Sequence, residues 1–378
     1  MKESGKKRAA FRYRLDRSIR ILVMRIMNGM TPDLRDQEVA FQPHKIKKIL
    51  IVRSLFRMGD AILATPAILL FHRNFPAAKI DFVGSPISKL LFENLPIDRH
   101  YEMCKSFPHA GWSYLALLKK IRETKYDLAF DASGSSAASG SVIVGLSGAR
   151  LRVGVQGKWD RWFNVRLDRP AAKNKYHNLP ALAGSLGLER RLVYPRLFLS
   201  PTEVQHGRTR IRTLVGGAEA PIVGIFVGGR KARGKRWNKE NFLELAQRLR
   251  AAGARPVIFA GPDEKDLLAY FQRELGRSAP AIFEPNVRLF ASLVANCNLF
   301  VACDSGPVHL ACALRVRTVV IFLTDDFNRW GPPADLARIV RREMASSVDP
   351  VFKTCRQELL ESSRKSSDSR LHGARCGQ

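Results

Sequence analysis

The sequence is short of acidic side chains, of long hydrophobic runs and of paired cysteines. Only 34 of its 378 residues are Asp or Glu, against 63 Lys and Arg, which gives a formal charge of +29 and a pI near 10.5. No apolar run reaches the roughly 18 residues that a bilayer-spanning helix needs. A 46% apolar fraction still supplies hydrophobic cores, and the length predicts two domains.

Several cofactor signatures are missing. The six cysteines form no CxxC pair and no CxxC…HxxxH pattern, which argues against a zinc module or a disulfide framework. No GxGxxG follows a strand-like segment, which argues against NAD or FAD. The basic N-terminus lacks the apolar core and cleavage site of a signal peptide. We therefore expect a chain without metal or cofactor that works in the reducing cytoplasm.

Residues 1–30 concentrate positive charge. They hold nine Lys and Arg against Glu3 and Asp16, a net charge of +7. Such a segment, if helical and amphipathic, either lies on an anionic membrane surface or packs on the protein's own domain. Together with the linker that follows it, which is bounded by prolines, this segment would form a separate region over residues 1–44. Its apolar residues recur at the three- and four-residue steps of a helix: Phe11, Leu15, Ile19, Leu22, Ile26 and Met30.

Short β-branched runs alternate with helix-length amphipathic segments through the body of the chain. This alternation is typical of an α/β fold whose parallel sheets are covered by helices on both faces. It is interrupted where prolines cluster, so we place a boundary near Ser200, between doubly wound domains over 45–200 and 201–340 that face a central cleft. Residues 341–378 end in a Ser/Arg-rich stretch, and we expect a divergent, partly disordered tail. The expected strands are Ile49–Val52, Ile80–Val83, Leu128–Phe130, Leu151–Val155, Ile222–Val227, Pro256–Phe259, Leu299–Ala302 and Thr318–Phe322, with helices at Asn241–Ala251 and Asp263–Leu275.

Asp60 lies on the first strand-to-helix connection. A carboxylate there faces the crevice between domains, where it can accept a proton from a substrate hydroxyl. Gly59 permits close approach of a backbone or ligand. The alternative interpretation is that Asp60 caps the following helix, because Asp is a common N-cap residue.

The loop over 229–236 is rich in glycine and basic residues and follows a predicted strand. It matches GxxxxGK, but Arg236 stands where a P-loop needs Ser or Thr to hold magnesium. We therefore reject a P-loop. Its glycine amides and its cations, Lys235 among them, suit a diphosphate, while a merely solvated basic loop is the alternative.

The segment DSGPVHLA at 304–311 also follows a buried strand. Amides at Ser305 and Gly306 can face an anion at the start of the next helix. Asp304 and His309 flank that position. The alternative is that Asp304 is an N-cap and His309 an ordinary structural histidine.

Together these segments resemble the glycosyltransferase family 9 heptosyltransferases, the ADP-heptose:lipopolysaccharide transferases. The resemblance covers about residues 45–333 and rests on the order of its motifs. The matching stretches are KILIVRS at 48–54, MGDAILATP at 58–66, KRWN at 235–238 followed by Phe242, GPDE at 261–264, DSGPVHLA at 304–311 and RWGP at 329–332.

The resemblance implies a GT-B fold of two Rossmann-like domains, with the nucleotide sugar on the C-terminal domain and the acceptor on the N-terminal one. It implies an inverting, metal-independent displacement in which Asp60 is the general base and Lys235 pairs with the donor diphosphate. Asp263, or nearly equally Glu264, would contact the ribose. The remaining donor-loop residues that it implies, which would hold the heptose and phosphates, are Asp304, Ser305, Gly306 and His309.

The expected partners are ADP-heptose and an anionic glycolipid acceptor at the cytoplasmic face of the inner membrane. Two departures from the family pattern are Asn238 in place of a proline, and the tail beyond Pro333 in place of helices that return across the domain gap. They keep a catalytically weak or silent member open as an alternative. Another nucleotide sugar, or a sugar-nucleotide epimerase, is a second alternative. Nucleic acid is not expected as a partner, because the basic residues lack interleaved aromatics.

Overall fold

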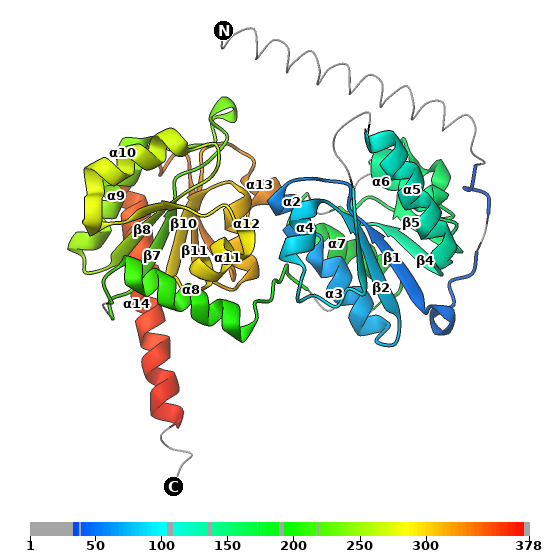
Figure 1. Ribbon diagram of the computed structural model, residues 1–378, viewed down its shortest axis with the longest axis horizontal. Helices are drawn as coiled ribbons and strands as arrows, with labels where there is room; N and C mark the ends of the chain where they lie inside the picture. The colour runs from blue at the N-terminus through cyan, green and yellow to red at the C-terminus, as the bar shows by residue number, and fades with distance from the viewer. Residues whose placement is uncertain are drawn as a thin grey trace.

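The computed structural model describes residues 33–37, 39–103, 109–134, 138–171, 173–188, 193–217 and 219–373. These residues form two domains that lie side by side, each built on one sheet (Figure 1). The predicted basic helix over 1–30 lies outside the described residues. Among the described residues, no helix combines the length and the apolar composition needed to cross a membrane.

The first sheet has the strand order β3-β2-β1-β4-β5-β6, and all its neighbours are parallel. Ile49 of the central strand pairs with Ile80 on one side and Leu128 on the other. The chain therefore reverses its winding direction between β1 and β4, and ligands of such sheets bind at that switch point. The strands are β1 (Lys48–Val52), β2 (Lys79–Gly84), β3 (Arg99–Glu102), β4 (Leu128–Asp131), β5 (Leu151–Val155) and β6 (Val165–Leu167).

The second sheet repeats this topology. Its order, β12-β11-β10-β7-β8-β9, is again parallel throughout, and its switch point lies between β7 and β10. The predicted boundary at Ser200 falls on the N-cap of the first helix of this domain. The strands are β7 (Ile222–Phe226), β8 (Arg255–Ala260), β9 (Ala281–Phe283), β10 (Leu299–Cys303), β11 (Thr318–Phe322) and β12 (Ala337–Arg341).

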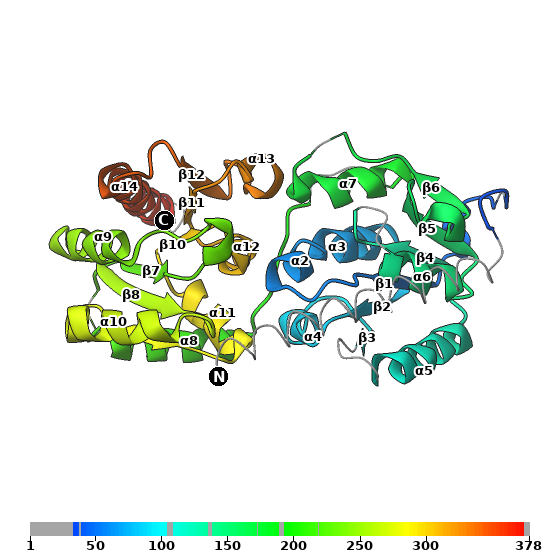
Figure 2. The ribbon, with the colours of Figure 1, turned by 90° about the horizontal axis from the view of Figure 1, so that it is seen from above.

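Helices cover both faces of each sheet (Figure 2). The first domain carries α2 (Met58–Ile62), α3 (Thr65–Asn74), α4 (Pro86–Leu91), α5 (His109–Thr124), α6 (Ala138–Leu146) and α7 (Lys175–Ser185), with 3₁₀ turns η1 (Pro43–Lys45) and η2 (Asp160–Trp162). The second carries α8 (Pro201–Leu214), α9 (Lys239–Ala251), α10 (Lys265–Leu275), α11 (Val287–Ala295), α12 (Gly306–Ala313), α13 (Phe327–Trp330) and α14 (Val348–Gly373), with η3 (Lys231–Arg233) and η4 (Gly276–Ser278).

Alternating residues of the central strands enter separate cores, because successive side chains point to opposite faces of a sheet. Ile49 and Ile51 of β1 pack on one face, in a core that continues into the second domain, whereas Leu50 packs on the other face. In β7, the neighbouring residues Ile222 and Val223 likewise pack into two different cores, one on each face of the second sheet. All eight predicted strands are present within one or two residues.

The structure corrects two expectations. Strands β3, β6, β9 and β12 were not predicted, because all four lie at sheet edges and their side chains are only partly buried. The region 341–378 was expected to be a divergent, partly disordered tail, but α14 begins at Val348. Its first turns pack on α9 and on the second sheet, with Val351 and Cys355 fully buried. The apolar residues before Ser362 account for this helix, and residues 374–378 lie outside the described part.

Candidate active site

The predicted site residues gather where the two switch points face each other. Asp60 follows β1, the basic loop over 229–236 follows β7, and Asp304 follows β10. Helix α2 of the first domain packs against α12 of the second, and α7 packs against α13, so the carboxyl ends of both sheets meet at this junction (Figure 2). The fold therefore brings the motifs of both halves of the chain to one place.

Asp60 is buried, with 8% of its surface exposed. It lies inside α2 rather than at its N-cap, which is Arg57, so the capping alternative is wrong. Its Oδ1 pairs with the Arg53 guanidinium at 3.4 Å. Arg53 is buried, with 5% of its surface exposed, and also donates to the Ala132 carbonyl. Among the described residues no hydrogen bond engages Oδ2 of Asp60, which leaves that oxygen for a substrate proton.

Lys235 lies between two carboxylates. Its Nζ is 2.5 Å from Oδ2 of Asp304 and 2.5 Å from Oδ2 of Asp326. Asp304 is nearly buried, whereas the Asp326 side chain is 42% exposed. Burial raises the pKa of Asp304, and the Lys235 ammonium opposes that shift. The lysine is thus held at the site by carboxylates, one of which faces solvent.

Cations outnumber carboxylates at the junction. Burial and the neighbouring Arg57 lower the pKa of Arg230, and burial and Arg53 lower the pKa of Lys175. Asp60 faces both groups and opposes both shifts. Repulsion among like charges is relieved by an anionic ligand, so the junction suits phosphate groups. The cations are Arg53, Arg57, Lys175, Arg230, Arg233, Lys235 and Arg329.

Glycines allow α2 and α12 to touch. A Cβ on Gly59 would lie 2.7 Å from Cδ2 of His309, and a Cβ on Gly306 would lie 3.2 Å from Cβ of Met58. His309 is 5% exposed, and its Nδ1 lies 2.7 Å from the Tyr176 hydroxyl of α7. The structure thus places His309 against the first domain. Ser305 is the N-cap of α12, so Asp304 is not, and the capping alternative is wrong there too.

Glu264 and Asp263 have different surroundings. Glu264 is buried and accepts from the amides of Gly261 at 3.1 Å and Gly229 at 3.4 Å, which ties the turns after β8 and β7 together. Burial raises its pKa, and the two amides oppose the shift. Asp263 is exposed. Of the two, only Asp263 has a carboxylate that is not held by these backbone turns.

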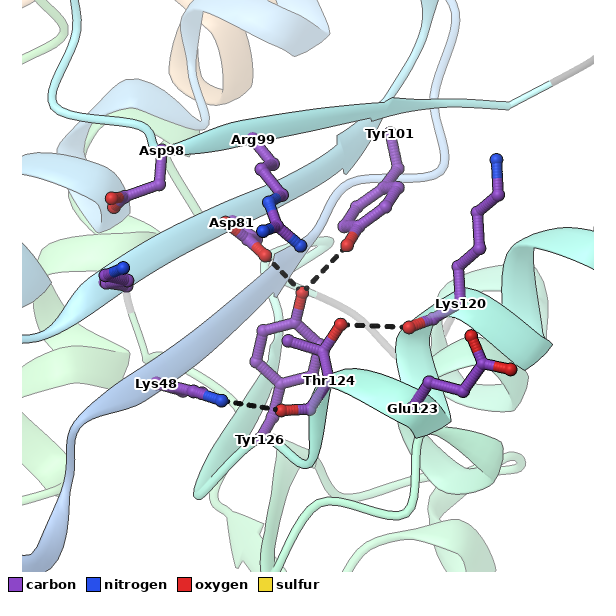
Figure 3. Close-up of a pocket in the computed structure, with 10 residues that line it drawn as sticks. Lys48, Asp81, Asp98, Arg99, Tyr101, Lys120, Glu123, Thr124 and Tyr126 are labelled. Carbon is purple, nitrogen blue, oxygen red and sulfur yellow. Dashed lines mark hydrogen bonds between the residues drawn. The ribbon is translucent and has the colours of Figure 1, made fainter.

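One surface pocket includes part of the basic loop over 229–236, and another lies away from the junction. The first, of about 560 Å³, is lined in part by Arg236 and Arg342. The other, of about 550 Å³, lies at the amino ends of β1, β2 and β3 (Figure 3). There the Tyr126 hydroxyl donates to buried Asp81, and Lys48 donates to the Thr124 carbonyl at 3.1 Å. Because these groups already bond to one another, and parallel sheets bind ligands at their carboxyl ends, this second pocket is not the candidate site.

No group of three His, Cys, Asp or Glu among the described residues is arranged to hold a metal ion. Sequence reasoning did not find Tyr176, Asp326 or Lys175. Tyr176 and Lys175 follow a proline-rich stretch that gave no strand or helix signal, and Asp326 lies in a short loop whose partner, Lys235, is distant in sequence. Only the fold brings these three residues to the junction.

Two parallel six-stranded sheets that meet at their switch points define the GT-B class of glycosyltransferase folds. The family model described as glycosyltransferase family 9 (heptosyltransferase) matches residues 114–360, and the chain belongs to this family. It is therefore an enzyme of the glycosyltransferase type.

Relatives cover most of the chain. Lipopolysaccharide heptosyltransferase 3 of Escherichia coli is 24% identical over 72% of this chain and 83% of its own length. Lipooligosaccharide heptosyltransferase 2 of Campylobacter jejuni is 23% identical over 79% of this chain and 88% of its own. The structure of E. coli ADP-heptose lipopolysaccharide heptosyltransferase II matches with a TM-score of 0.70 at 21% identity, over 84% of this chain and 99% of that one.

Proposed function

We propose that this protein transfers heptose from ADP-heptose to a hydroxyl of a lipopolysaccharide-core or related glycolipid, with inversion at the anomeric carbon. The observation that carries the proposal is the position of buried Asp60 directly beside the donor loop, across the contact of Gly59 with His309. Membership of family 9 and the names of the relatives, which transfer heptose to lipopolysaccharide or lipooligosaccharide, support the sugar and the acceptor class.

The proposed reaction is a single displacement. Oδ2 of Asp60 takes the proton of the acceptor hydroxyl, and the acceptor oxygen forms a bond to the anomeric carbon. The bond from that carbon to the donor diphosphate breaks, and its electron pair leaves with ADP. Because the attack comes from the face opposite the leaving group, the anomeric configuration inverts. Arg53 holds the other oxygen of Asp60 and so fixes the orientation of the base.

Lys235 would stabilise the charge that develops on the leaving diphosphate. A bound diphosphate competes with the carboxylates that hold Lys235 in this structure. Asp326 is the more exposed of the two, so we expect the diphosphate to displace it while Asp304 keeps the lysine in place. Arg230, which faces both Asp60 and Asp304, can contact the same phosphates. Asp263 remains the candidate for the ribose, and the amides of Ser305 and Gly306 for a phosphate.

The acceptor we propose is itself anionic and part of a membrane. The formal charge of +29 and the net +7 within residues 1–30 favour association with an anionic lipid surface. We therefore propose that the enzyme works in the cytoplasm, in peripheral contact with the inner membrane. Sedimentation of the full chain with vesicles of anionic and of zwitterionic lipid tests this: equal binding to both would contradict it.

The function is tested by transfer assays with ADP-, UDP- and GDP-sugars and a lipopolysaccharide-core acceptor. We expect transfer from ADP-heptose alone, and an inverted glycosidic bond by NMR. Asp60→Asn should lower kcat by about 100-fold or more, the contribution of a positioned base. Asp168→Asn is the control, since Asp168 is an exposed aspartate of the same domain. Full activity of Asp60→Asn would contradict the base assignment, and transfer from UDP-sugars would contradict the donor.

A further inference from the structure

Tyr176, His309 and Gly59 join three elements of two domains. The Tyr176 hydroxyl of α7 lies 2.7 Å from Nδ1 of His309 on α12, and their ring centroids are 5.5 Å apart. The other edge of the imidazole faces Gly59 of α2, where a Cβ would lie 2.7 Å from Cδ2. Tyr176 and Gly59 belong to the first domain and His309 to the second.

We propose that Tyr176 and His309 form an interdomain pin that positions Asp60 against the donor loop. The two are positioning residues: neither contacts substrate in this assignment, and both act through the placement of α2. The proposal rests on the proposed function, because it presumes that Asp60 acts on a donor bound by the second domain.

The burial of the pin favours positioning over ligand binding. Tyr176 is 1% exposed and His309 is 5% exposed. The Tyr176 hydroxyl bonds to Nδ1 of the imidazole, Gly59 faces its Cδ2, and the Trp330 ring of α13 lies 6.4 Å from it, centroid to centroid. Burial also lowers the pKa of His309 to about 4, so the ring is neutral at pH 7 and offers no charge to a phosphate.

The pin contacts Gly59, which is next to the proposed base, and His309 of the pin lies five residues after Asp304, the partner of Lys235. Gly59 immediately precedes Asp60, and Asp304 precedes the N-cap of α12, the helix that carries His309. If the imidazole shifts, α2 moves with respect to α12 and the base moves with respect to the donor. Misplacement of a reacting group by about 1 Å can cost about 100-fold in rate, so a small shift is sufficient to show in kcat.

Two substitutions of His309 separate positioning from ligand binding. The amide of Asn reaches the place of Nδ1, the atom that bonds to Tyr176, whereas the amide of Gln reaches the place of Nε2. We expect His309→Gln to lower kcat by about tenfold or more and His309→Asn to lower it less. A ligand contact through Nε2 predicts the reverse order, and that order would overturn the proposal.

Tyr176→Phe tests the same bond from the other domain. We expect kcat to fall by about tenfold while the Kd of ADP, measured by calorimetry, changes less than about twofold. Tyr270→Phe is the matched control, since Tyr270 lies on α10 in the second domain and its ring makes surface contacts with Lys239 and Arg273. The proposal would be overturned if Tyr176→Phe left kcat unchanged, or if it weakened ADP binding by the same factor by which it lowered kcat.

These outcomes are distinct from those that test the function itself. If wild-type protein transfers no heptose, the proposed function fails before any variant is compared. The pin then still predicts that Tyr176→Phe loosens the contact between domains, which increases the radius of gyration in small-angle X-ray scattering relative to Tyr270→Phe. An unchanged radius in that case would overturn the pin independently of activity.

Discussion

The ammonium nitrogen of Lys235 lies 2.5 Å from Oδ2 of Asp304, and both side chains are about nine-tenths buried. The lysine follows β7 and the aspartate follows β10, the two strands that flank the switch point of the second sheet. This ion pair therefore fixes a positive charge at the place where doubly wound domains bind phosphates. It also makes the site dependent on the lysine, because Asp304 would otherwise be a buried charge without a counterion.

Lys235→Ala is expected to weaken donor binding and to destabilise the second domain. Loss of a charge-assisted contact corresponds to about 1.5–3 kcal/mol, so the Kd of ADP should rise about 10- to 100-fold. Lys353→Ala removes an exposed lysine that pairs with Asp349 on α14 and is the control for net charge. Titration calorimetry measures both variants. A similar Kd for wild type and Lys235→Ala would exclude the diphosphate role.

Asp263 and Glu264 are expected to separate donor binding from stability. Glu264→Gln replaces one carboxylate oxygen, which accepts a hydrogen bond from the amide of Gly229 or Gly261, by an NH2 group that cannot accept one. The free energy of unfolding, measured by thermal denaturation, should therefore fall by about 1–3 kcal/mol. Asp263→Asn should leave the melting temperature unchanged and raise KM for the donor. If Glu264→Gln instead raises KM with no loss of stability, Glu264 is the ribose contact and Asp263 is not.

The cores of both sheets could be predicted from sequence because their strands are buried on both faces. Such strands are continuous apolar runs, as in Ile222–Phe226 and Thr318–Phe322. The unpredicted strands lack that signal: Arg99–Glu102 is polar and partly exposed, and it pairs only because β2 is already in place. Helix α14 was misjudged because the polar residues at its far end outweighed the few apolar ones that bury its first turns.

The site residues, like the strands, include some that a local sequence pattern predicts and others that it does not. The positions of Asp60, Lys235 and Asp304 could be predicted from sequence because their motifs follow strongly apolar strands. The pairing of Lys235 with Asp326 and the contact of His309 with Tyr176 join residues far apart in sequence, with no local pattern that marks them. The first pair depends on how the second domain folds and the second on how the two domains dock, and no periodicity within a segment predicts either contact.

Two buried histidines are expected to destabilise the fold as the pH falls from about 6.5 to 4. Burial lowers the pKa of both His100 and His309 to about 4, below the ordinary value of about 6.5. In this window the unfolded chain binds protons that the folded chain does not, so acid favours unfolding. Burial also raises the pKa of four carboxyl groups, that of Asp131 to about 6 and those of Asp81, Glu264 and Asp304 as well, and these groups contribute with the opposite sign.

His100→Asn should make that pH dependence shallower. Each histidine contributes at most about 1.4 kcal/mol per pH unit within the window. Chemical denaturation at several pH values measures the slope. The control is His72→Asn, since His72 is exposed on α3. A slope that His100→Asn leaves as steep as in the wild type would contradict the assignment.

Arg288 connects the two domains next to the linker between them. It is 7% exposed, and its guanidinium donates to both oxygens of Glu203, at 2.6 Å and 2.5 Å. It also donates to the carbonyls of Phe198 at 3.2 Å and Leu91 at 3.4 Å, and Leu91 ends α4 of the first domain. Glu203 in turn closes the capping box of α8 with Ser200. One planar guanidinium thus satisfies acceptors from α4, the linker and α8.

Arg288→Ala is expected to lower the free energy of unfolding by about 1.5–3 kcal/mol, because it removes the charge-assisted hydrogen bonds to Glu203. Arg288→Lys should recover only part of this loss, since a single ammonium cannot match the two-pronged contact with Glu203. Arg273→Ala, which removes an exposed ion pair with Glu274, should cost less than about 1 kcal/mol. Urea unfolding measures all three. If Lys substitutes fully for Arg288, the guanidinium's several contacts contribute nothing beyond its charge, and the link between α4 and α8 is electrostatic only.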